Sequence, residues 1–143
     1  MARALNIGKA SGQMPVGAQN AVGSPKVRAY QAAMRASAAE AASHLAKLLS
    51  RRIAAYTVGA KDIKTLVRWA EGEAEPRDAE KVKRLKVAYE IALLLAEFDS
   101  PATIKVWFIG PNPFLEDESP VDAVREGKLK EALAAAYAFA VSG

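Results

Sequence analysis

Apolar residues recur three and four positions apart along most of the chain beyond residue 23, which is the spacing of amphipathic helices. Serine followed by proline opens several of these stretches, because serine caps a helix and proline is tolerated in its first turn. Valine, isoleucine and threonine never alternate over the length of a strand. The pattern predicts an all-α fold, with a helix from residue 24 that precedes or joins one over 37–49, and further helices over 51–58, after residue 59 to residue 72, and over 78–98, 100–110 and 120–141.

The predicted helix 78–98 carries a continuous apolar stripe, formed by Val82, Leu85, Ala88, Ala92 and Leu95. Its second half, residues 91–95, is apolar all round. Such a helix is either the central helix of a core or half of a dimer interface. We expect a homodimer joined through this part of the chain, with Leu94 at the contact.

Two short predicted helices, 51–58 and the one that ends at Gly72, are separated by a turn at Gly59. Each has an apolar face at helical spacing, made of Ile53, Ala54 and Val58 in the first and of Ile63, Leu66, Val67 and Ala70 in the second. Basic and polar residues remain for the outer surface, namely Arg51, Arg52, Lys61, Lys64, Thr65 and Arg68. A helix-turn-helix protein places its phosphate and base contacts there. The segment therefore predicts a DNA-binding helix-turn-helix, and the alternative is two amphipathic helices with solvated lysines.

A dense run of loop-forming residues, 107–115, lies between two of the predicted helices. Ser119 can cap the helix that follows, Pro120 fits its first turn, and Asp122 completes a carboxylate form of the capping box. On spacing alone, this is a well-capped loop that orients two packed helices. The alternative is a surface that binds a partner.

Together these segments resemble one family, the Xre-type antitoxins, whose C-terminal part is the toxin-binding domain shared with the ParS group. The resemblance covers roughly residues 45–143 and rests on Arg68, Trp69, Gly72 and Glu73, on Pro76 and Arg77, and on Trp107, Asn112, Leu115, Pro120 and Gly127. The chain departs from the family pattern where a glycine usually follows the Asn-Pro-x-Leu element, since it has Glu116 and Asp117 there. It also has Val124 where leucine is common.

The resemblance implies a type II antitoxin that neutralises a partner toxin, commonly an NAD-degrading enzyme of the RES type, and that represses its own operon by binding operator DNA. The expected toxin-binding residues are Trp107, Asn112, Phe114, Leu115, Tyr137 and Phe139. For Trp107 the alternative is a core residue, and Phe114, in a proline-flanked acidic loop, is the better candidate for an exposed contact. Large aromatic side chains of this kind dominate the energy of protein interfaces. The alternative function is a stand-alone helix-turn-helix regulator or phage-type repressor without a toxin.

Net charge differs between the first and second halves of the chain. Residues 1–46 have a net charge of +4, residues 47–86 of +5 and residues 87–143 of −5, within a chain of net charge +4. A basic first half and an acidic second half indicate two surfaces with different partners. The predicted organisation is a flexible tail over 1–23, a helical region with the helix-turn-helix over 24–77, and a small helical toxin-binding and dimerisation domain over 78–143.

No residue pattern in the chain predicts catalysis, a cofactor or a metal site. It contains no cysteine, a single histidine (His44), no P-loop and no dinucleotide fingerprint. No apolar run reaches the roughly 18–20 residues that span a bilayer, and the N-terminus lacks the apolar core of a signal peptide. We therefore expect a non-enzymatic cytoplasmic protein without a membrane partner, associated with the nucleoid when bound to its operator.

Overall fold

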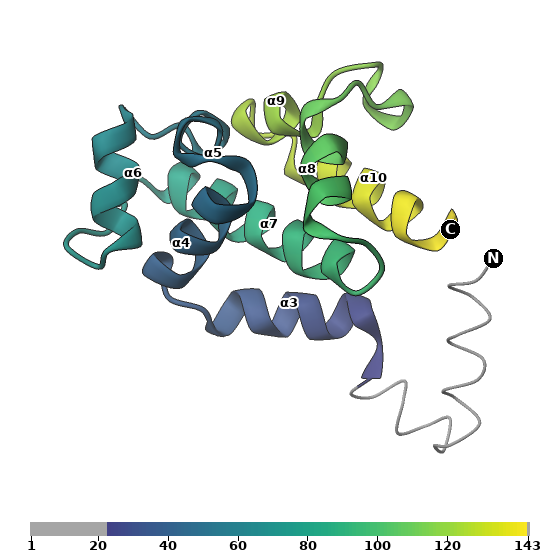
Figure 1. Ribbon diagram of the computed structural model, residues 1–143, viewed down its shortest axis with the longest axis horizontal. Helices are drawn as coiled ribbons and strands as arrows, with labels where there is room; N and C mark the ends of the chain where they lie inside the picture. Colours follow the sequence, from purple (N-terminus) through teal and green to yellow (C-terminus); the bar gives the residue numbers. More distant parts are fainter. Residues whose placement is uncertain (1–22, 143) are drawn as a thin grey trace.

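A computed structural model describes residues 23–142, and this part of the chain is helical without strands (Figure 1). The predicted all-α class is therefore confirmed. The predicted tail, apart from Gly23, lies outside the described residues. The elements are α3 (Pro25–Arg35), α4 (Ala38–Leu49), α5 (Arg51–Val58), α6 (Ile63–Ala70), α7 (Ala79–Ala96), α8 (Pro101–Ile109), the short 3-10 helix η2 (Pro113–Leu115), α9 (Pro120–Arg125) and α10 (Leu129–Ser142).

The predicted serine caps are present. Ser37 and Glu40 form a reciprocal capping box at α4, in which the Glu40 amide donates to Ser37 Oγ at 3.0 Å and the Ser37 amide donates to Glu40 Oε1 at 3.0 Å. Ser24, Ser100 and Ser119 cap α3, α8 and α9, each followed by proline in the first turn. These local signals fix where α3, α4, α8 and α9 begin, because they satisfy amide groups that have no partner inside the helix.

The predicted single helix over 120–141 is wrong. The chain forms α9 and α10 instead, with Gly127 between them in the left-handed region at φ +86°. The Gly127 amide donates to the Val124 carbonyl at 2.9 Å, and the Lys128 amide donates to the Ala123 carbonyl at 2.8 Å. These two bonds close the end of α9 in the manner of a Schellman motif, which turns the chain before α10 starts.

Helix α7 crosses the middle of the molecule, and its neighbours surround it (Figure 1). It contacts α3, α4, α5, α8, α9 and α10. Leu85, Ala88, Ile91, Ala92 and Leu95 are completely buried, and Leu94 is only 4% exposed. Helix α7 is therefore the central core helix, and the expectation that Leu94 lies at a dimer contact is wrong, since α7 is covered within one chain.

One hydrophobic core runs through the described residues, from Ala29 in α3 to Ala140 in α10. Helix α5 packs on α9 as well as on α4, α6 and α7. The regions before and after residue 77 therefore share one core. None of the helices in residues 23–142 is both long and apolar enough to cross a membrane.

Candidate DNA and protein interfaces

Helices α5 and α6 are joined by the four residues 59–62, whose geometry depends on a glycine. Gly59 has φ +77°, its amide donates to the Tyr56 carbonyl at 3.2 Å, and the Ala60 amide donates to the Ala55 carbonyl at 2.9 Å. A Cβ on Gly59 would lie 2.9 Å from Nη1 of Arg84 in α7. A side chain at residue 59 would therefore be strained by the backbone conformation, and the flexible end of Arg84 would have to move to make room for it.

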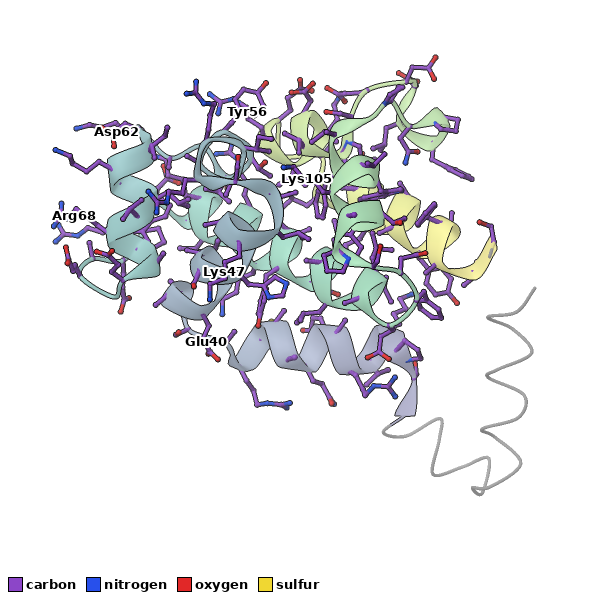
Figure 2. All side chains as sticks on the ribbon, viewed as in Figure 1. Glu40, Lys47, Tyr56, Asp62, Arg68 and Lys105 are labelled. Atoms are coloured by element: carbon purple, nitrogen blue, oxygen red, sulfur yellow. The ribbon has the colours of Figure 1, made fainter. Side chains whose placement is uncertain are left out.

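Helix α6 faces the core with Leu66, which is fully buried, and Trp69, which is 5% exposed. Lys61, Lys64 and Arg68 are exposed, as expected. Figure 2 shows Arg68 pointing away from the rest of the molecule. The Arg68 guanidinium makes only a long contact, with Nε 4.0 Å from Glu73 Oε1, and both side chains are more than half exposed. Such a pair contributes little to stability and leaves Arg68 available for a polyanion.

Two residues assigned to the buried face of this helix lie elsewhere. Ile63 is 38% exposed and Val67 is half-buried, while Trp69 fills the core in their place. At 3.6 residues per turn, residues 63 and 67 share one flank of α6, on the opposite side from residues 65 and 69. The outer surface of α6 thus carries apolar as well as basic side chains.

Thr65 has a structural contact at the start of α6. Its hydroxyl donates to Asp62 Oδ1 at 2.7 Å, and its amide donates to the same oxygen at 2.8 Å. These two bonds, the hydroxyl bond first, lower the pKa of Asp62 below its ordinary value. In the free chain, Thr65 therefore belongs to the N-cap of α6 rather than to a set of unengaged polar groups.

Arg51 and Arg52 are exposed at the N-terminal end of α5. Arg51 lines a groove of about 460 Å³ between α4, α5 and α6, together with Lys47 of α4 and with Val67 and Glu71 at the far end of α6. The structure therefore brings Arg51 close to the C-terminal half of α6. We call the five exposed basic residues of this region the basic surface: Arg51, Arg52, Lys61, Lys64 and Arg68.

Three of the six expected toxin-binding residues are buried, and a fourth is half-buried. Trp107 is 9% exposed, and its ring packs edge-on to Phe108 at 5.3 Å and tilted against Phe139 at 6.1 Å. The Trp107 Nε1 atom is buried without an acceptor in the described part of the chain. Leu115 is 6% exposed, and Phe139 is half-buried. These residues act as core or supporting residues rather than as exposed contacts in the free chain.

Asn112 holds the loop before α9 together and is 6% exposed. Its Oδ1 accepts from the Phe114 amide at 2.9 Å, and its carbonyl accepts from the Leu115 and Asp117 amides, both at 2.9 Å. The compact turn places Glu116 at φ 55° and Asp117 at φ 68°. This is the place where the chain departs from the glycine of the family pattern, and a left-handed conformation is the one that glycine adopts at least cost.

Exposed apolar side chains occur in this loop and on the helix that leads into it. Phe114 is 69% exposed in η2, and Val106 and Ile109 are 65% and 47% exposed on α8. We call these three residues the apolar surface. Sequence reasoning named Phe114 but missed Val106 and Ile109, although their spacing of three places them on one side of a helix that has apolar residues all round. Tyr137 is 44% exposed on α10, where Lys26 Nζ lies 4.7 Å from the centre of its ring.

A set of contacts between α5 and α9 connects the region of the basic surface with the C-terminal helices. The Tyr56 hydroxyl donates to Asp122 Oδ1 at 2.6 Å, and Arg125 Nη1 donates to the Tyr56 carbonyl at 2.6 Å. The Arg125 guanidinium also lies 4.3 Å from the centre of the Tyr56 ring. The hydrogen bond to Asp122 raises the pKa of Tyr56. Tyr56 and Asp122, which sequence reasoning did not pair, therefore join the end of α5 to α9.

Within residues 23–142, no group of three or more histidine, cysteine or acidic side chains could hold a metal ion. His44 is half-buried on α4 and packs edge-on against Tyr89 of α7 at 5.3 Å. Burial, followed by the nearby charge of Lys47, lowers the pKa of His44.

Comparison of the chain with protein-family models, curated proteins and solved structures found no match.

Proposed function

We propose that this protein is a DNA-binding antitoxin, with the basic surface on operator DNA and the apolar surface on a protein toxin. The observation that carries the proposal is the pair of short helices α5 and α6, joined at Gly59, with Lys61 exposed just before the second helix and Lys64 and Arg68 exposed along it. A helix of this kind fits the major groove, where basic side chains contact phosphates and base edges. Arg51 and Arg52 supply further positive charge for the DNA backbone.

The toxin is proposed to bind around η2 and the exposed side of α8. Val106, Ile109 and Phe114 together expose apolar side chains that a folded chain would ordinarily cover with another surface. The adjoining Glu116 and Asp117 are exposed acids at the edge of this surface. An aromatic anchor with a polar rim is typical of protein interfaces. By resemblance to the Xre-type antitoxins, the partner is a RES-type enzyme that degrades NAD.

A second candidate function uses the same apolar surface in another way. In a stand-alone regulator, Val106, Ile109 and Phe114 would contact a second copy of this chain, because α7 offers no uncovered apolar face for a dimer. Dimers are common among helix-turn-helix proteins, which read paired half-sites.

Two matched variants test the antitoxin proposal in the native host, by co-expression with a toxin-sized reading frame beside this gene. K64A/R68A should bind the operator at least about thirtyfold more weakly and still rescue growth. V106D/I109D should lose rescue and still bind the operator, because both side chains are exposed and their replacement spares the core. Rescue by both variants together with a dimer-to-monomer change in V106D/I109D would favour the stand-alone regulator. Operator binding by K64A/R68A equal to that of the natural protein would contradict the assignment of the basic surface.

A further inference from the structure

The exposed side of α6 has an unusual composition for a basic surface. Ile63, the first residue of the helix, is 38% exposed, and Val67, one turn later, is half-buried on the same flank. Lys64 and Arg68 follow each of them by one position and are exposed. Two stripes therefore run side by side along α6, one apolar and one basic.

Exposure of Ile63 follows from the way α6 begins. Asp62 caps the helix through both the amide and the hydroxyl of Thr65, which fixes the backbone at residue 63. Leu66 and Trp69 already fill the core beneath α6. Ile63 is thus a large apolar side chain in a well-defined position, among Lys61, Lys64 and the helix N-terminus.

DNA offers one apolar group to a helix in the major groove, the C5 methyl group of thymine. Lysine and arginine recognise phosphates and the acceptor atoms of guanine. The charge of the basic surface complements duplex DNA, whereas an exposed isoleucine contributes nothing to phosphate binding. Val67 lines the groove that also contains Arg51, so this flank of α6 lies next to basic side chains of other helices as well.

We propose that Ile63, flanked by Val67, is a specificity-determining residue that contacts a thymine methyl group in the major groove. The inference rests on the proposed DNA binding by α5 and α6, and it adds a base preference to that function. Recognition of the methyl group is independent of the hydrogen bonds made by Lys64 and Arg68, because deoxyuridine and thymidine present the same donors and acceptors.

The test begins with a duplex selected from random-sequence DNA by the full chain. Thymidines of this duplex are then replaced by deoxyuridine, one at a time, and dissociation constants are measured by fluorescence anisotropy at one fixed salt concentration. We expect one or more positions where loss of the methyl group weakens binding by about fourfold, the ratio that corresponds to burying one methyl-sized group. In the I63A variant that ratio should fall to about one.

A matched variant separates the methyl contact from general affinity. K64A should bind every duplex more weakly and keep the fourfold ratio between thymidine and deoxyuridine. Equal binding of thymidine and deoxyuridine duplexes by the natural protein, or an unchanged ratio in I63A, would overturn the inference and leave the proposed DNA binding intact. Failure of the natural protein to bind any duplex would overturn the proposed function and the inference with it.

Discussion

At the scale of single residues, backbone conformation explains positions that composition leaves unexplained. Gly59 and Gly72 have nearly the same φ, +77° and +76°, and differ in their surroundings. A Cβ on Gly59 would lie 2.9 Å from Arg84 Nη1, whereas a Cβ on Gly72 would meet nothing within 4 Å. The sequence indicates a turn at both glycines, but the contact with Arg84 depends on where α7 packs.

Alanine substitution of these two glycines should separate backbone strain from packing. Gly72→Ala should lower the free energy of unfolding by about 1–2 kcal/mol, the ordinary penalty for a left-handed residue other than glycine. Gly59→Ala should cost more, because Arg84 must also move. Urea denaturation gives both free energies of unfolding. Equal losses in the two variants would show that the Arg84 contact has no energetic consequence.

His44 should make stability depend on pH near neutrality. Its pKa is lowered in the folded chain, so the unfolded chain binds a proton more readily, and stability should fall as the pH decreases through the ordinary histidine value of about 6.5. Glu90 changes in the opposite sense at lower pH, since burial raises its pKa. Urea denaturation at pH 7.5 and 5.5 should therefore show a smaller loss for His44→Gln than for the natural chain. The same loss in both proteins would contradict this assignment.

At the scale of the elements, helix starts could be predicted and tertiary placement only in part. Ser37, Ser100 and Ser119 carry local signals that do not depend on the rest of the chain, so the helices after them begin where expected. The break at Gly127 was missed because apolar spacing continues across it. Ile63 was assigned to the core because periodicity alone does not reveal that Trp69 occupies the space beneath α6.

In helix α8, too, periodicity alone does not reveal which side chains are buried. Val106 and Trp107 are neighbours in an apolar run, yet Val106 is exposed and Trp107 is buried. Trp107→Ala should reduce the free energy of unfolding by about 3–5 kcal/mol, because it removes a buried aromatic side chain. Val106→Ala, at a position that is 65% exposed, should change it by less than about 0.5 kcal/mol. Denaturation of both variants checks the difference. A large loss of unfolding free energy in Val106→Ala would contradict the exposed position of this side chain.

At the scale of the whole molecule, the two proposed surfaces share one core and are joined by Tyr56, Asp122 and Arg125. The basic candidate residues could be identified from the sequence because exposed charge follows from helical periodicity. The proposed partner surface could be identified only at Phe114, since Trp107, Asn112 and Leu115 are buried while Val106 and Ile109 are exposed. Which side of a helix with apolar residues all round faces solvent is decided by the helices packed around it.

The central claim, that α5 and α6 bind DNA, is tested most directly by the salt dependence of binding to duplex DNA from upstream of the gene. Affinity of the natural protein should fall steeply between about 50 and 200 mM salt, because bound counterions are released from the phosphates. K64A/R68A should bind at least about thirtyfold more weakly at low salt, because each side chain contributes on the order of 1–3 kcal/mol. A control variant, R35A/K130A, removes two exposed charges from α3 and α10 and should bind like the natural protein. Absence of binding at low salt, or equal affinity and salt dependence for K64A/R68A and the natural protein, would contradict the claim.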